Sequence, residues 1–179
     1  LSRIHGALDI NGDITAPNEQ SYTLAYGAGL NPHDWINITA NGMAHGQGIT
    51  LGRWDASNLD GLYTVRLQVI LTDRSVLEAT VQVTVDNVPP TVTLTAPQPG
   101  TTFSGSTVEL VANASDNLPD GMYVEFYHND KLIDTVKQTP FTTTWKIDSN
   151  GPQTFYAIAY DLAGNSAKST PITVTTSGQ

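Results

Sequence analysis

Four tyrosines in the second half of the sequence have the spacing expected of a shared β-sheet face. Two of them alternate with valine and phenylalanine in the stretch YVEFYH, and two alternate with phenylalanine and alanine in FYAIAY. Because successive residues of a strand point to opposite faces, a core on the apolar side would turn Tyr123, Tyr127, Tyr156 and Tyr160 outward. Such an aromatic face can stack on sugar rings or dock a partner domain. The structural alternative is cross-strand packing that shields the sheet, or burial against the first half of the chain.

The same two stretches hold the pair of carboxylates that glycoside hydrolysis would need. Glu125 lies in the first stretch and Asp161 follows the second, so neighbouring strands would bring them close together. However, Asp161 begins the sequence DLAGN, which is typical of a hairpin turn in which the aspartate side chain bonds the backbone. A sandwich face also offers no deep pocket for a substrate. We therefore expect Asp161 to stabilise a turn rather than to take part in a reaction.

Histidines and serines form no known metal-binding or nucleophile motif. The four histidines lack His-x-His or His-Glu-x-x-His spacing, although His33 and His45 both fall in predicted long loops and could meet there. No Gly-x-Ser-x-Gly turn is present, and Ser57, Ser75 and Ser104 lie in ordinary turn sequences. A Ser-His-Asp triad would need such side chains to meet in space, since its order along the chain differs between folds. We expect no catalytic residue and no metal ligand among these side chains.

Two prolines interrupt the alternating pattern near the middle of the chain, where residues 84–97 read TVDNVPPTVTLTAP. Proline fixes φ, lacks an N–H and biases its predecessor toward an extended conformation, so this stretch predicts a short, semi-rigid joint between two modules. Alternatively, Asp86 and Asn87 could offer oxygens to calcium at this joint. Asp-Asn before proline is also ordinary turn chemistry, and no second carboxylate lies nearby in the sequence. The joint is the preferred interpretation, with calcium as the alternative.

The composition is that of an acidic, cysteine-free chain of 179 residues with a formal net charge of −9. This charge would repel nucleic acid, and no basic stripe is present to overcome the repulsion. The absence of cysteine excludes disulfides, thiolate metal sites and a cysteine nucleophile. No stretch approaches the roughly 20 apolar residues of a membrane span. The first residues, LSRIHGALDI, do not form a signal peptide, and their strand-like alternation suggests a piece of a longer protein.

Period-2 alternation recurs along the whole chain, and Asn-Gly and Asp-Gly turn signals separate the alternating stretches. No window shows a helical stripe, so the sequence predicts an all-β protein. Its two halves are alike: each has a tryptophan, Trp54 or Trp145, and then a glycine, a long alternating strand, a turn and a final strand. We predict two tandem Ig-like (fibronectin III-like) β-sandwiches, 1–87 and 88–179, each with one tryptophan in its core. The residues of ATVQVTV predicted to face inward are Val81, Val83 and Val85.

Both halves resemble known bacterial modules. The first resembles an Ig-like module that follows the catalytic domains of class A penicillin-binding proteins, on the stretches YGAGLNPHDWINI, LGRWDASNLDGLYTVRLQVILTD and VTVDNVPPTV. The second resembles the bacterial Ig-like modules of exported cell-wall and polysaccharide enzymes, on VELVANASDN, VEFYHNDKLIDT, PFTTTW and FYAIAYDLAGNSA. The resemblance covers nearly the whole chain. It implies an extracytoplasmic location, which is periplasmic, in the cell wall or secreted.

The resemblance invites a search for penicillin-binding chemistry, which requires a Ser-x-x-Lys nucleophile, a Ser-x-Asn and a Lys-Thr-Gly. Ser115-Asp116-Asn117 spells the middle motif, but no serine lies three residues before a lysine and Lys-Thr-Gly is absent. We therefore expect this motif to be a strand-end turn and the fragment to be non-catalytic. It would be a spacer, docking or wall-targeting region of a larger envelope protein, with peptidoglycan, another polysaccharide or neighbouring domains as partners. The alternative is a carbohydrate-binding module that uses the four tyrosines.

Overall fold

Every regular element of the protein is a β-strand in the computed structural model, which describes residues 1–177. The all-β prediction is therefore confirmed. The chain divides into two compact units, Leu1–Asn87 (unit 1) and Val88–Gln179 (unit 2). No helix among the described residues is long and apolar enough to cross a membrane.

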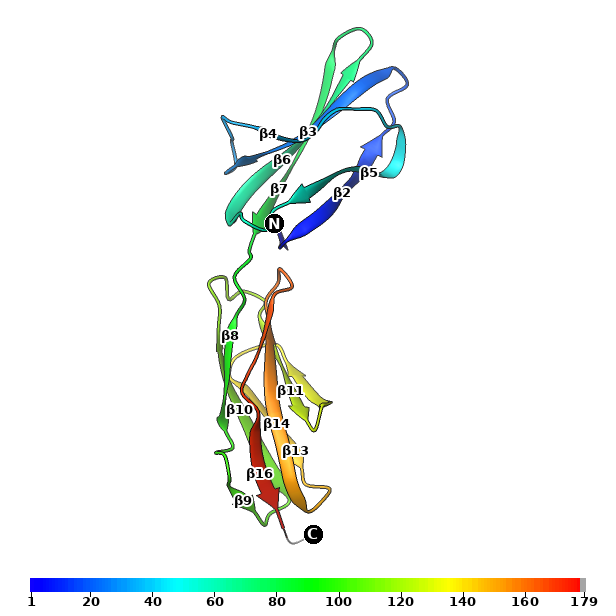
Figure 1. Cartoon of the computed structure of the whole chain (residues 1–179). Helices are drawn as coiled ribbons and strands as arrows, with labels where there is room; N and C mark the ends of the chain where they lie inside the picture. The colour runs from blue at the N-terminus through cyan, green and yellow to red at the C-terminus, as the bar shows by residue number, and fades with distance from the viewer. Residues whose placement is uncertain (178–179) are drawn as a thin grey trace. The chain divides into compact units, whose positions relative to one another are not determined.

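Unit 1 is a sandwich of one wide and one narrow sheet. The wide sheet has the strand order β1-β7-β6-β3-β4, and β2 pairs with β5 in the narrow, two-stranded sheet. Neighbouring strands are antiparallel except for the parallel pair of β1 and β7. Figure 1 shows β2 and β5 as a layer beside β3, β6 and β7. The strands are β1 (Ser2–Ile4), β2 (Ala7–Ile14), β3 (Glu19–Ala28), β4 (Ile36–Gly42), β5 (Gly46–Asp55), β6 (Gly61–Leu71) and β7 (Val76–Val85).

The narrow sheet covers only part of the wide one, and this limits the core of unit 1. Trp54 of β5 is 2% exposed and contacts Tyr26 and Tyr63, with ring centroids 5.0 and 6.0 Å away. Val83 and Val85 are buried as predicted. Val81 lies on the same side of β7, opposite the buried Val65, so its predicted direction is right, but it is 55% exposed and not part of the core. Val81 lies on a strand near the margin of the wide sheet, where a covering sheet of two strands does not reach it.

Unit 2 is also a two-layer sandwich. Its smaller sheet has the order β13-β10-β8, and its larger sheet has the order β12-β11-β14-β16-β9, with β15 also paired to β14. The strands are β8 (Thr91–Ala96), β9 (Thr102–Phe103), β10 (Thr107–Ser115), β11 (Tyr123–His128), β12 (Lys131–Val136), β13 (Phe141–Lys146), β14 (Gly151–Tyr160), β15 (Ser166–Lys168) and β16 (Ile172–Thr176).

The core of unit 2 follows the predicted alternation closely. Phe126 and Phe155 are fully buried, and Trp145 is 7% exposed with its ring edge-on to Phe155 at 5.4 Å. Asn129 and Asp130 join β11 to β12 as a two-residue turn in which both φ angles are positive, at 43° and 64°. This left-handed geometry matches the twist of a hairpin, and asparagine and aspartate tolerate it better than most residues. The turn sets where β11 ends and β12 begins.

Candidate functional site

The four tyrosines predicted as a shared surface do lie together on one face of the larger sheet of unit 2. Strands β11 and β14 are antiparallel neighbours, and their register places Tyr123 opposite Tyr160 and Tyr127 opposite Tyr156. Val124 between them is fully buried in the core, so the tyrosines occupy the opposite, outer side of the strands. We call the set Tyr123, Tyr127, Tyr156 and Tyr160 the tyrosine face.

The rings of the tyrosine face stack on one another across the two strands. The Tyr123 and Tyr160 centroids are 4.9 Å apart with an interplanar angle of 12°, and those of Tyr127 and Tyr156 are 4.9 Å apart at 9°. Near-parallel rings at this separation form the aromatic cross-strand pairs that stabilise sheets. Each ring thus uses one of its two flat sides on a tyrosine of the same unit, and that side is closed to a sugar.

Tyr156 is buried rather than exposed, which corrects the expectation that all four rings face solvent. Only 7% of the residue is accessible, because Tyr127 covers one side of its ring and the Lys168 Nζ lies 3.5 Å from the ring centroid. Its hydroxyl donates a 3.1 Å hydrogen bond to Asp130 Oδ1 in the hairpin turn. A cation over a ring and a bonded hydroxyl leave Tyr156 little free surface for a ligand.

Three hydroxyl groups of the tyrosine face, those of Tyr127, Tyr156 and Tyr160, have a raised pKa. The Tyr127 hydroxyl donates to Glu125 Oε2 at 2.7 Å, and this hydrogen bond, aided by burial, raises the pKa of Tyr127 above its usual range. Burial is the largest cause of the raised pKa of Tyr156, and also of Tyr160, where the Glu125 charge adds to it. Raised pKa values mean that these phenols remain protonated near neutral pH. They can donate hydrogen bonds, but they offer no phenolate nucleophile.

The two carboxylates considered for glycoside hydrolysis serve local structure. Asp161 Oδ1 accepts hydrogen bonds from the backbone N–H groups of Gly164 and Asn165, at 2.7 and 2.8 Å, so the predicted aspartate-bonded turn is confirmed. Glu125 is engaged by the Tyr127 hydroxyl. Retaining and inverting glycoside hydrolysis both need two carboxyl groups that face a bound sugar. Here one carboxyl group accepts from a tyrosine hydroxyl and the other from backbone N–H groups of its own turn.

One proximity of acidic groups in unit 2 was not predicted. Asp116 follows β10, and its Oδ2 accepts a 2.8 Å hydrogen bond from the Leu118 N–H, which confirms the strand-end turn. The structure also brings a carboxylate oxygen of Asp116 within 4.8 Å of one from Asp161. No local sequence pattern indicates this proximity, because the two residues are 45 positions apart and belong to different turns. Both carboxylates are engaged by their own turns.

His45 was expected to be able to meet His33, but its partner in the structure is Glu19. Its Nδ1 lies 2.5 Å from Glu19 Oε1, at a cavity of about 260 Å³ that apolar residues such as Ile14 and Val69 also line. His45 is exposed, whereas Glu19 is largely covered. The pair joins the start of β3 to the segment between β4 and β5, and therefore links two neighbouring parts of unit 1.

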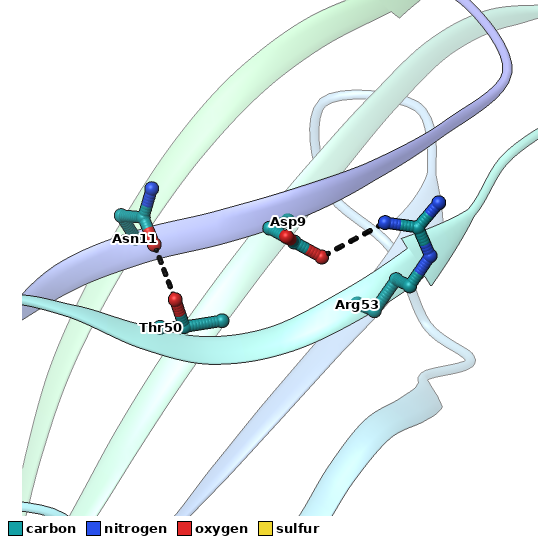
Figure 2. A network of polar contacts seen from close by, with 4 residues as sticks. All are labelled: Asp9, Asn11, Thr50 and Arg53. Carbon is teal, nitrogen blue, oxygen red and sulfur yellow. Dashed lines mark hydrogen bonds and ion pairs between the residues drawn. The ribbon is translucent and has the colours of Figure 1, made fainter.

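The outer side of the narrow sheet in unit 1 carries a ladder of polar cross-strand pairs (Figure 2). Arg53 Nη1 donates to Asp9 Oδ1 at 3.1 Å, and Thr50 Oγ1 donates to Asn11 Oδ1 at 2.9 Å. These partners lie opposite each other in the register of β2 and β5. Both members of the ion pair are more than half exposed, so the pair contributes at most about 1 kcal/mol. The ladder specifies strand pairing rather than a reaction.

Asn87, expected at the joint, has a structural role inside unit 1. Its Oδ1 accepts the Gly6 N–H at 2.8 Å, and its Nδ2 donates to the carbonyl oxygens of Ala56 and Leu59 at 2.9 and 2.7 Å. One side chain therefore ties the start of the unit and the loop after β5 to its last residue. Calcium binding by Asp86 and Asn87 stays a prediction. The amide oxygen that Asn87 would offer to calcium already accepts a hydrogen bond from the Gly6 N–H.

Comparisons with known proteins agree with this architecture. Residues 90–158 match the family model described as the bacterial Ig domain. No curated protein matches the sequence. Among solved structures, the fibronectin(III)-like modules of CbhA from Clostridium thermocellum are 22% identical over 99% of this chain and 88% of that one, with a TM-score of 0.61. Chicken CNTN1 FN1–FN3 domains are 13% identical over 98% and 61% of the two chains, with a TM-score of 0.57.

A third similar structure, murine CEACAM1b, is 13% identical over 98% of this chain and 95% of that one, with a TM-score of 0.50. At such identities the likeness concerns the fold alone. The resemblance of the chain to tandem Ig-like and fibronectin III-like modules is thus confirmed, and the sandwiches seen in the structure are of this class.

Proposed function

We propose that this chain is a non-catalytic accessory region of a larger exported bacterial protein, in which it is a spacer or docking segment. The closure of the tyrosine face supports this function most directly: its rings stack in pairs, and Tyr156 is covered by Tyr127 and Lys168. The other groups that could do chemistry, Glu125 and Asp161, are bonded within unit 2. Because these side chains make their hydrogen bonds and ring contacts within unit 2, they stabilise the module and are not available to a substrate.

The larger protein is part of the same proposal. The sequence resemblance implies a class A penicillin-binding protein, in which this region would follow the catalytic domains, at the cell wall or in the periplasm. Fold alone does not determine function, so the parent is inferred from the resembling sequence stretches and not from the sandwiches. The formal net charge of −9 disfavours tight binding to an anionic polymer, which also agrees better with a spacer than with a wall anchor.

Carbohydrate binding on the tyrosine face is the second candidate. Tyr123, Tyr127 and Tyr160 are each only partly covered, and the neighbouring Leu132 on β12 is 47% exposed. The stacked pair of Tyr123 and Tyr160 could still present ring edges and one flat side of each ring to a sugar. If the chain binds carbohydrate on this face, replacing Tyr160 must weaken that binding. If the chain is a spacer, there is no carbohydrate binding for the replacement to weaken.

Co-sedimentation of the chain with insoluble peptidoglycan separates the two functions. For a spacer or docking segment we expect the folded wild type to remain in the supernatant, at the level of an unrelated acidic protein. A carbohydrate-binding module would sediment, and Tyr160→Ala would largely abolish this, since the stacking of a planar ligand such as a base on one aromatic ring contributes about 1–3 kcal/mol, or roughly fivefold to 150-fold in affinity. Thr175→Ala, an exposed change on β16 of the same sheet, is the matched control. Sedimentation that Tyr160→Ala abolishes and Thr175→Ala preserves would contradict the spacer.

A further inference from the structure

An arginine on the outer side of the wide sheet of unit 1 lies against a tryptophan ring. Val65 of β6 is buried in the core, so its neighbour Arg66 faces the opposite, outer side. The guanidinium carbon of Arg66 lies 3.8 Å from the centroid of the Trp35 ring, and Trp35 comes from the loop between β3 and β4. Cation–π attraction holds a guanidinium in such a position. We call Arg66 and Trp35 the arginine–tryptophan stack.

The loop that carries Trp35 is fixed to the outer side of the sheet. Gly27 of β3 lies beneath this loop, and a Cβ atom at Gly27 would overlap the ring of Pro32. Thr64 lies opposite Gly27 on β6, and its hydroxyl donates a 2.7 Å hydrogen bond to the carbonyl oxygen of Gly29. The close approach at Gly27 and the hydrogen bond of Thr64 anchor the loop on the same side as Arg66. The stack is therefore preorganised before any ligand arrives.

The guanidinium of Arg66 has hydrogen-bond donors without an acceptor. The side chain makes no hydrogen bond or ion pair with any of residues 1–177. Its Nε atom is buried without a partner, whereas Nη1 and Nη2 are not buried. Glu78 lies on the neighbouring strand β7, but its Oε2 accepts a hydrogen bond from Gln68. Because charged donors in proteins normally have an acceptor, Nη1 and Nη2 are available to one from outside the chain.

We propose that the arginine–tryptophan stack binds the carboxylate group of a ligand through Nη1 and Nη2 of Arg66. Two N–H groups of one guanidinium can donate in parallel to the two oxygens of a carboxylate, and this fork gives the contact its geometry. The edge of the guanidinium that includes Nε is closed, because Nε is buried. Since Trp35 already restrains the guanidinium, binding orders little that was free before.

The surroundings of the stack favour a single carboxylate with polar groups beside it. Thr80 of β7 lies opposite Arg66 on one side, and Ala25 of β3 lies opposite it on the other. Asn37 of β4 is the next residue in this cross-strand row, beyond Ala25. Asn37 and Thr80 are exposed, so their amide and hydroxyl groups can bond further groups of the ligand.

The charge of the chain narrows the ligand class further. The formal net charge of −9 opposes phosphates and acidic polymers more strongly than it opposes one carboxylate. The ligand is therefore a monocarboxylate with hydroxyl or amide groups, such as an acidic amino-acid residue or a sugar acid. This site belongs to unit 1 and does not depend on how the tyrosine face of unit 2 is used.

Acetate is the simplest probe of the site, and nuclear magnetic resonance of the full 179-residue chain reports its binding. Sodium acetate replaces sodium chloride at constant ionic strength, so that the general screening of charges stays unchanged. We expect saturable shifts of the Trp35 indole N–H and Arg66 Nε–H signals. Arg66→Gln should abolish the saturable shift at Trp35, and Arg66→Lys should weaken acetate binding at least about fivefold, since one ammonium cannot replace the fork. Arg53→Gln is the matched control and should bind acetate as the wild type does, because Arg53 is exposed and already paired with Asp9.

Two further ligands identify the source of the carboxylate. Glucuronate and a glutamate residue capped at both ends each carry one carboxylate but different polar groups, and the one that binds more tightly than acetate identifies the ligand class. Their neutral counterparts, glucose and capped glutamine, should not bind. Equal affinities for all three acids would support the carboxylate site but contradict the roles of Asn37 and Thr80.

The proposal is overturned if no carboxylate produces a saturable shift at Trp35, or if Arg66→Gln binds acetate as the wild type does. Binding by Arg66→Lys that equals that of the wild type also overturns it, because any cation would then suffice. Dispersed amide signals show whether each variant is folded. If Arg66→Gln does not fold, the comparison of Arg66→Lys with the wild type decides.

Discussion

Replacing Phe126 with alanine is expected to destabilise unit 2 by about 3–5 kcal/mol, a large share of the roughly 5–15 kcal/mol that stabilises a typical domain. Phe126 is fully buried in the core of unit 2, between strands on both sides of β11. Removing its ring loses apolar burial and leaves a cavity that the surrounding strands cannot fill by relaxing. Urea unfolding followed by the fluorescence of Trp145, the core tryptophan of this unit, measures the loss.

A neighbouring position supplies the control for this substitution. Leu132 lies on β12, which pairs with β11, and it is 47% exposed. Leu132→Ala should change the stability of unit 2 by less than about 0.5 kcal/mol, since surface changes away from special contacts are usually small. Similar losses for both variants would mean that the β11 core contacts do not carry the stability of unit 2.

Replacing Asn87 with alanine is expected to destabilise unit 1 by about 2–3 kcal/mol. The change leaves the Gly6 N–H and the carbonyl oxygens of Ala56 and Leu59 without the partner that Asn87 provides. A partly buried backbone group that loses its hydrogen bond costs about 1–3 kcal/mol, although water can recover part of this at an accessible loop. The shift in the urea midpoint of unit 1 measures the effect.

Asn58 is the matched control, because it lies between Ala56 and Leu59 in the same loop and is exposed. We expect Asn58→Ala to be nearly neutral. A second variant, Asn87→Asp, keeps the oxygen that accepts from Gly6 but loses the amide donor and places a charge near two carbonyls. It should therefore destabilise unit 1 as well. A neutral Asn87→Ala would show that the three hydrogen bonds form in the structure without contributing to stability.

The sequence predicted those features of the fold that depend on local alternation and on neighbouring strands. Strand periodicity alone was enough to place Phe126 and Phe155 in a core, and to put Tyr127 and Tyr156 on the other side of the same sheet. Turn chemistry was equally local, so the hydrogen bonds of Asp161 within its own turn could also be predicted.

Features that depend on contacts between distant segments could not be predicted. Val81 has the alternation of a core residue, but its burial depends on how many strands the opposite sheet contains. Tyr156 is covered by Lys168, which reaches it from β15, and no local pattern near Tyr156 indicates a cation. Asn87 bonds residues as far away as Gly6, 81 positions earlier. In each case a partner far along the chain decides the role of the residue.

If the chain consists of two self-contained β-sandwich units, each unit folds without the other, and equilibrium unfolding of separate pieces measures whether this is so. Residues 1–87 and 88–179 would be produced as individual chains and unfolded in urea beside the intact protein. We predict that each piece folds and unfolds in a single cooperative transition, because each unit has a core of its own. A piece that stays unfolded without the other, or that loses structure gradually, would contradict the claim.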